Sequence, residues 1–369
     1  MNRLFRWDQM GLFLLALAAG ILPFAVPEVC AAALREGLTL CSGPLLLSLF
    51  PFLVVSRLLI QCPESDLLAL PFRLAAWGIG IRTPCAARVL CIGFLGGFAP
   101  AASAAAQAVR TGQLTAEEAD ALLPACICSG PSFVVLTVGQ SLLGSAELGV
   151  LLFAAQITAN YLTAALLNRF AGVHSVKPGS AAPASPAPPR LDEILADAAI
   201  TYCKLCGFIL FFRMLAAGAG ALLPTGAGTL CSILLEVCSG CDLASRTGRW
   251  GSLLCCAALS VQGLSVLLQV RTICPPEMTL RPLYRARMLH LPLSLALFYL
   301  LLPGGEADVF STLPVRVLLM RRVPPDCALL VFAVCCMAAC TLRGGIRQVE
   351  QKQMARNAGG CCINSKTLL

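Results

Sequence analysis

Two short segments of small and polar residues lie inside apolar runs of this sequence and have the composition of anion-binding helix breaks. They are residues 129–132 (SGPS) and residues 262–265 (QGLS). If a helix breaks at each segment, the N–H groups freed at the start of the next half-helix carry partial positive charge and can bind a carboxylate. Small residues there would also allow close helix packing, so both roles stay open for the glycines. The candidate substrate-binding residues are Ser129, Gly130, Ser132, Gln262, Gly263 and Ser265, and we favour a functional role for Ser132 and Gln262.

Three further polar residues in apolar surroundings are candidates for ion or anion contacts. Glu236 is a carboxylate within an apolar run and, together with Gln269, is a candidate site for a coupling cation or proton. The alternative for Glu236 is a hairpin end in contact with water. Lys204 shares a helix face with Asp197 and Thr201 and could meet an anion as a point charge. The alternative, which we favour, is that Lys204 extends its ammonium group to the membrane surface.

Enzyme and metal chemistry have little support in this sequence. Two Cys-x-x-Cys pairs, at 203–206 and 238–241, have the spacing of zinc ligands, but both lie in apolar stretches and the chain has only two histidines. We find no nucleophile–base constellation, no H-E-x-x-H and no glycine-rich phosphate loop. The sequence therefore predicts no enzyme activity, no metal and no cofactor.

The composition is that of a membrane protein. Of 369 residues, 58% are hydrophobic and 12% are charged, and the mean hydropathy is +0.81. Soluble domains carry about 25% charged residues, and disordered chains are poor in apolar residues. The net charge of +8 is scattered over several loops, which argues against a nucleic-acid partner. The 21 cysteines lie largely in apolar runs, where we expect reduced thiols that act as small hydrophobes.

Uncharged runs long enough to cross a bilayer recur along the chain. A span needs about 20 apolar residues. Runs of this kind cover residues 9–27, 37–56, 121–146, 148–168, 214–235 and 250–270. Residues 288–305 and 327–342 are shorter candidates, and residues 194–215 also read as a span, interrupted by Lys204 and Arg213. Residues 89–109 and 222–243 contain several glycines and a proline each, which favours re-entrant hairpins over straight spans. The predicted fold class is an all-α polytopic membrane protein with about eight transmembrane helices plus two re-entrant hairpins.

The distribution of basic residues predicts the orientation and the domain limits. The N-terminus, the 73–88 loop, the linker, the 271–287 loop and the C-terminal tail are expected inside, while the arginines of residues 316–322 conflict with this orientation. We expect a first half of the membrane domain at 1–170 and a Pro/Ala/Ser-rich cytoplasmic linker at 171–192. A second repeat half at 193–275, additional C-terminal spans at 276–345 and a basic cytoplasmic tail at 346–369 follow.

The two halves carry traces of an internal repeat. Residues 49–59 (LFPFLVVSRLL) align with residues 205–215 (LCGFILFFRML), and Pro51 and Gly207 are helix breakers at the same place. Residues 129–134 align with residues 262–267 through a shared Gly and Ser, and each half has its broken run between these two segments. The predicted orientations of the halves are opposite, and inverted repeats with broken helices are typical of secondary transporters.

Six segments resemble the sporulation integral membrane proteins of the YlbJ (SpoVV) type. In chain order they are 48–53 (SLFPFL) with Arg57, 93–98 (GFLGGF), 110–119 (RTGQLTAEEA), 129–133 (SGPSF), 235–240 (LEVCSG) and 262–269 (QGLSVLLQ). The resemblance covers about residues 10–275. The sequence departs from the family pattern at Pro100, which is displaced, at Cys126 and Cys128, which replace asparagines, and at Gln262, which replaces a glycine.

The resemblance implies a transporter that moves dipicolinate, a small anionic metabolite, across the bacterial cell membrane that surrounds the forespore during endospore formation. The family is related to nucleoside-recognition gate-domain proteins and concentrative nucleoside transporters. Expected partners are the lipid bilayer, the anionic substrate and a coupling cation or proton. A non-transporting sporulation scaffold and a nucleoside-type transporter are the alternatives, but a scaffold has no need of broken helices and polar groups at membrane depth.

Overall fold

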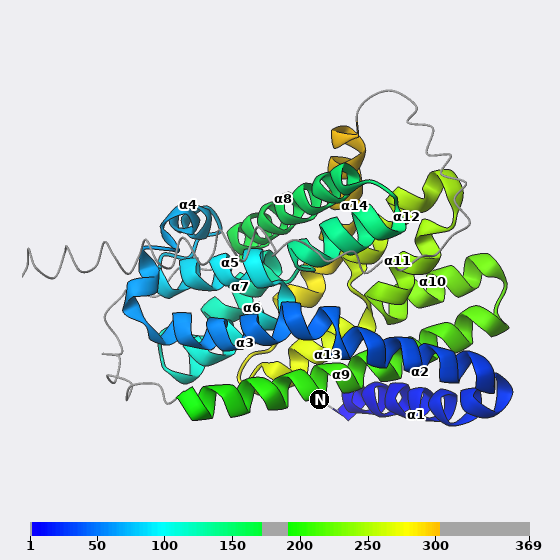
Figure 1. Ribbon diagram of the computed structural model, residues 1–369. Helices are drawn as coiled ribbons and strands as arrows, with labels where there is room; N and C mark the ends of the chain where they lie inside the picture. The colour runs from blue at the N-terminus through cyan, green and yellow to red at the C-terminus, as the bar shows by residue number, and fades with distance from the viewer. Residues whose placement is uncertain (1, 172–190, 303–369) are drawn as a thin grey trace, which may run out of the picture.

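The computed structural model describes residues 2–171 and 191–302, and every regular element in these two ranges is a helix (Figure 1). The first range contains α1 (Asn2–Ala25), α2 (Pro27–Ser42), α3 (Pro44–Gln61), η1 (Pro63–Asp66), α4 (Leu70–Gly78), α5 (Pro84–Gly96), α6 (Phe98–Arg110), α7 (Ala116–Cys126), the π-helix η2 (Ser132–Leu142) and α8 (Ala146–Ala171). The second contains α9 (Leu191–Leu222), α10 (Thr225–Leu235), α11 (Val237–Ser245), η3 (Gly248–Trp250), α12 (Gly251–Val261), α13 (Gly263–Ile273) and α14 (Arg281–Leu301). Nearly all of the expected linker, the 327–342 span and the basic tail lie outside the described residues.

Three helical segments of the described chain are long and apolar enough to cross a membrane. They are Ala146–Phe170, Leu191–Leu222 and Gly248–Ile273. A fourth results if Phe13–Ala25 and Pro27–Ser42, which meet at 111°, form one bent span. The protein is thus an all-helical chain, in its described ranges, with three or four candidate spans.

Several expected spans are divided by helix ends. Residues 37–56 are interrupted at Gly43, between α2 and α3, where Pro44 begins a new helix. Residues 121–146 contain the end of α7 and the whole of η2, and residues 214–235 are shared by α9 and α10. Helix α14 covers much of 288–305, but its first turns carry three arginines, and it is not among the candidate spans. Helix ends therefore divide several apolar runs that hydropathy alone predicts to be continuous spans.

Both broken runs consist of two short helices that pack against each other. Residues 89–109 lie in α5 and α6, which are joined at Gly97, and residues 222–243 lie mainly in α10 and α11, which are joined at Glu236. Each run therefore has the helix–break–helix form that a hairpin requires.

The breakers expected at Pro51 and Gly207 do not break their helices, and this expectation was wrong. Helix α3 continues through Pro51, and α9 runs unbroken through Gly207 for 32 residues. Glycine weakens a helix by only about 1 kcal/mol, which tertiary packing against α2, α3 and α10 outweighs.

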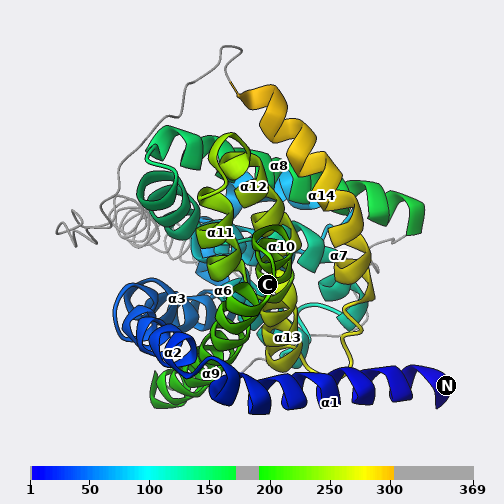
Figure 2. The same ribbon diagram turned by 90° about the vertical axis from the view of Figure 1, so that its right-hand side faces the viewer.

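The helices enclose one main core with smaller clusters around it. The main core joins residues of α3 to α8, of η2 and of α10 to α14. Helices α1 and α8 lie on opposite sides of the bundle in both views (Figures 1 and 2). Helix α9 packs against α2, α3 and α10, so it connects the N-terminal helices with the second half.

Two facing glycines allow η2 and α8 to pack closely, and this contact can be tested. A Cβ on Gly139 would lie 2.5 Å from the Gly149 Cα atom. We therefore expect Gly139→Ala to lower the free energy of unfolding by about 1–3 kcal/mol through overpacking. The matched control is Gly207→Ala, whose Cβ meets nothing within 4 Å, and which should raise the free energy of unfolding by about 0.5–1 kcal/mol. Thermal unfolding in detergent measures both variants, and equal melting temperatures would contradict the role of this contact.

Candidate functional site

The break between α5 and α6 lies directly against the break between α7 and η2. Gly97 has a φ of +80°, which L side chains rarely adopt, and a Cβ there would lie 2.7 Å from the Gly130 backbone nitrogen. A Cβ on Gly130 would meet its nearest neighbour, the Gly96 carbonyl oxygen, at an ordinary 3.5 Å. The close approach therefore requires glycine at position 97, which is not among the predicted site residues, more strictly than at position 130.

The second half of the chain repeats this contact. Gly263 has a φ of +69°, and a Cβ there would lie 2.9 Å from the Leu235 carbonyl oxygen and 3.0 Å from the Glu236 nitrogen. The break between α12 and α13 therefore abuts the break between α10 and α11. For Gly263 this geometry favours the packing role over direct substrate contact.

A hydrogen bond joins the two pairs of breaks. Gln262 Nε2 donates to Ser129 Oγ at 3.4 Å and to the Leu259 carbonyl oxygen at 2.8 Å. Both side chains are buried, with 1% of Gln262 and 6% of Ser129 exposed. The structure thus brings the SGPS and QGLS segments together in one place, which we call the break junction and define by Ser129, Gly130, Gln262 and Gly263. Ser132 begins η2 next to it and is half-buried.

Gln262 itself stands in a backbone conformation that disfavours it. Its φ of 65° and ψ of −9° are left-handed helical, which costs a residue other than glycine about 1–2 kcal/mol. A glycine at this position would adopt this conformation freely. Its side chain also leaves Oε1 buried without a hydrogen-bond donor among the described residues. A strained backbone and an unpaired acceptor at one residue are a combination found at functional sites.

Gln269 and Ser265 extend this polar surface along α13. Gln269 Nε2 donates to Ser265 Oγ at 2.9 Å, and Gln269 Oε1 is a second buried acceptor without a donor in the described ranges. Ser265, Gln269 and Thr272 recur at i, i+4 and i+7 and therefore share one face of the helix. Gln269 and Glu236 were predicted to act together, but no hydrogen bond joins their side chains.

Arg287, on α14, holds the helix ends that precede the break junction. Its guanidinium donates to the carbonyl oxygens of Ile127, just after α7, and Ser260, in the last turn of α12. The final carbonyls of a helix lack partners within the helix, so one side chain satisfies two helix ends. Arg287 is 8% exposed, its Nε has no acceptor, and no carboxylate pairs with it within the described ranges. It places a buried positive charge beside the junction.

Asp120 fixes the start of the helix that carries Arg287. Its carboxylate accepts hydrogen bonds from Thr279 N at 2.8 Å, Thr279 Oγ1 at 2.6 Å and Leu280 N at 3.1 Å. Helix α7, which carries Asp120, begins with a capping box between Thr115 and Glu118. The sequence analysis missed Arg287 because it assigned this arginine to the positively charged 271–287 loop, which was used to predict the orientation of the chain. His290, one turn later in an apolar stretch, indicates that polar residues of this segment can be buried.

The carboxylate of Glu236 is used by the backbone of its own helix. Oε1 accepts from Cys238 N at 2.8 Å and Oε2 accepts from Ser239 N at 2.7 Å, so Glu236 is the N-cap of α11. Both oxygens are therefore engaged, and the residue is 2% exposed. Capping is the role that the structure gives to this carboxylate, and its coupling role stays a prediction.

Substitution of Glu236 separates capping from coupling. Serine is a strong N-cap without charge, whereas alanine at an N-cap costs about 1 kcal/mol. We expect Glu236→Ala to lower the free energy of unfolding by about 1 kcal/mol and Glu236→Ser to restore most of it, measured by thermal unfolding in detergent. If Glu236→Ser folds like the parent but loses the pH or cation dependence of uptake, the carboxylate does more than cap the helix.

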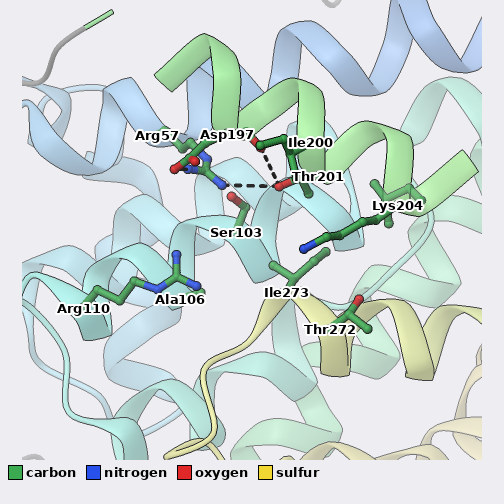
Figure 3. Close-up of a pocket in the computed structure, with 11 residues that line it drawn as sticks. Arg57, Ser103, Ala106, Arg110, Asp197, Ile200, Thr201, Lys204, Thr272 and Ile273 are labelled. Carbon is green, nitrogen blue, oxygen red and sulfur yellow. Dashed lines mark hydrogen bonds and ion pairs between the residues drawn. The ribbon is translucent and has the colours of Figure 1, made fainter. Parts of the chain in front are cut away.

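Lys204 lies away from the break junction, at a separate cavity. This cavity measures about 150 Å³ and is lined by residues of α3, α6, α9 and α13, among them Arg57, Arg110 and Lys204 (Figure 3). Arg57 forms an ion pair with Asp197 and donates to Thr201 Oγ1 at 3.4 Å. Asp197, Thr201 and Lys204 therefore lie on one face of α9, as predicted. This face lines a cavity and is also partly exposed at the surface.

Comparison with known proteins adds no relative. No protein-family model, no curated protein and no solved structure matches this chain.

Proposed function

We propose that this chain is a membrane transporter for a small organic anion. The observation that carries the proposal is the hydrogen bond between Gln262 and Ser129, which joins helix breaks from the two halves of the chain at one buried polar point. A scaffold or an anchor has no use for buried unpaired polar atoms, whereas a transporter needs a polar site enclosed by helices.

The charges around the junction favour an anionic substrate. Arg287 contributes a buried guanidinium without a carboxylate partner in the described ranges. Helices η2 and α13 both begin at the junction, and their N-termini add partial positive charge. We assign substrate contact to Ser129, Ser132, Gln262 and Ser265, and close packing to Gly97 and Gly263.

The equivalent contacts in the two halves support an internal repeat, which is inverted if the halves have the opposite orientations predicted from the basic residues. In each half, the break of a helix pair abuts the break that contains Gly-x-Ser, through Gly97 and Gly130 in one half and through Glu236 and Gly263 in the other. We propose that these pairs are the two re-entrant hairpins and that the complete chain has about eight spans.

The resemblance to the sporulation membrane proteins supports dipicolinate as the substrate. Under this proposal the protein lies in the bacterial cell membrane around the forespore and moves the dianion together with a cation or proton. Gln269 and Gln262 supply the unpaired oxygens for that coupling ion.

The same two oxygens favour a second candidate, a nucleoside. Gln262 Oε1 and Gln269 Oε1 lack donors among the described residues, and the N–H and O–H groups of a nucleoside are donors. The nucleoside alternative therefore rests on the two glutamine oxygens that lack donors. The anion proposal rests on the positive charge of Arg287 beside the junction.

Uptake into vesicles tests both candidates. The purified full chain is reconstituted into liposomes, and accumulation of labelled dipicolinate or uridine is measured under an imposed Na⁺ or proton gradient. Saturable dipicolinate uptake above that of protein-free vesicles supports the first proposal, and uptake of uridine alone supports the second. Absence of both fluxes from a folded, inserted protein would contradict a transporter of either class.

A further inference from the structure

The cavity that contains Lys204 has the charge of an anion site in its own right. Arg57, Arg110 and Lys204 line it, and Asp197 is its only carboxylate within the described chain. Arg57 and Asp197 form an ion pair and neutralise each other. Arg110 and Lys204 have no ion pair among the described residues, so the cavity carries two uncompensated positive charges.

Buried polar atoms without partners point into the same region. Ser103 is 3% exposed and its hydroxyl has no hydrogen-bond partner in the described ranges. The Nε of Arg57 is likewise buried without an acceptor. Thr201 and Thr272 also line the cavity, although their hydroxyls already donate to carbonyl oxygens of their own helices. Buried polar groups are normally satisfied, so unpaired donors beside two free cations indicate a ligand that supplies acceptors.

The positions of Arg110 and Lys204 indicate the shape of a ligand that would fit the cavity. Arg110 comes from α6 and Lys204 from α9, and they lie on opposite sides of the cavity, with Ser103 and Ile273 between them (Figure 3). Ile200 and Ile273 provide apolar walls. Two separated cations with apolar side chains between them match two carboxylates held apart by an apolar body.

We infer that this cavity binds a small dicarboxylate. The break junction is a different place: α6 and α13 begin at the breaks and end at the cavity, and the 11 residues of α13 span about 16 Å. The face of α13 with Ser265, Gln269 and Thr272 runs between them. In a transporter the cavity is a first binding position for the substrate, but the inference rests on the cavity and not on transport.

Binding to the detergent-solubilised full chain tests the inference, with phthalate as the dicarboxylate probe. We expect saturable phthalate binding by isothermal titration, at least about tenfold tighter than benzoate, which carries a single carboxylate. Arg110→Gln and Lys204→Gln should each weaken phthalate binding by about tenfold, because each removes one charge-assisted contact. Arg35→Gln, an exposed residue of α2, is the matched control and should bind like the parent. Arg110 and Lys204 are exposed, so their variants are expected to fold.

Three results would overturn the inference. They are no saturable phthalate binding to the folded parent, equal affinity in all four proteins, and inorganic phosphate binding as tightly as phthalate, which would indicate a site for a compact anion. Phthalate binding without flux in vesicles would instead contradict the proposed transport and leave this site in place.

Discussion

Replacement of Gln262 by glycine should reduce substrate uptake by about tenfold while leaving the protein folded. The variant loses the hydrogen bond to Ser129 and the unpaired Oε1 at the break junction, and one lost hydrogen bond of about 1.4 kcal/mol corresponds to a factor of ten. Glycine adopts the left-handed conformation of position 262 without strain, which offsets the lost bond to the Leu259 carbonyl oxygen. Initial rates of vesicle uptake and thermal unfolding in detergent measure the two effects separately.

Two companion variants sharpen this test. Ser129→Ala removes the partner of Gln262 and should reduce uptake in the same direction, whereas Gly130→Ala adds a Cβ in ordinary contact and should transport like the parent. Parent-like uptake by both the Gln262→Gly and the Ser129→Ala variant would place the substrate elsewhere. Gly263→Leu is not informative here, because a side chain at that position collides with the backbone of residues 235 and 236.

Replacement of Arg287 by glutamine should destabilise the protein by roughly 3 kcal/mol. The guanidinium donates to the carbonyl oxygens of Ile127 and Ser260, and a charged hydrogen bond of this kind contributes about 1.5–3 kcal/mol. Both acceptors are buried, and in the glutamine variant the Ile127 oxygen keeps only its 3.4 Å hydrogen bond from Asn160 Nδ2. A clear drop in melting temperature in detergent is the expected result.

A lysine at position 287 separates the effect of the positive charge from the effect of the two hydrogen bonds to carbonyl oxygens. Arg287→Lys keeps the positive charge beside the junction but cannot hold both carbonyls in the geometry of a guanidinium fork. We expect its stability to fall between those of the parent and the Arg287→Gln variant. The exposed control Arg35→Gln should melt like the parent. If Arg287→Gln melts with this control, the two helix ends are held by other contacts.

Together these residues describe a junction with few side-chain contacts. Its helices meet at breaks and through single side chains rather than through a continuous helix. Arg287 holds the ends of α7 and α12, whereas Gln262 and Ser129 are joined by a long hydrogen bond of 3.4 Å. In the proposed transporter, this is the bond that we expect substrate to replace.

Local sequence determined the breaks and the class of the protein. Long apolar runs with few charges permit only helices in a bilayer, since every backbone polar group must be satisfied within the segment. The glycines of residues 89–109 and the polar residue 236 mark true helix ends, and the SGPS and QGLS segments do lie at breaks. These features depend on the conformational preferences of neighbouring residues, which a sequence displays directly.

Only the tertiary structure decided which breaks meet and what each polar group does there. Ser129 and Gln262 are 133 residues apart, and Arg287 reaches Ile127 across 160. Glu236 has the same sequence context as a coupling carboxylate, yet both of its oxygens cap α11. The cavity takes its cations from three helices, α3, α6 and α9. Such contacts depend on how helices pack over long separations in the chain, and no local pattern of residue types specifies that packing.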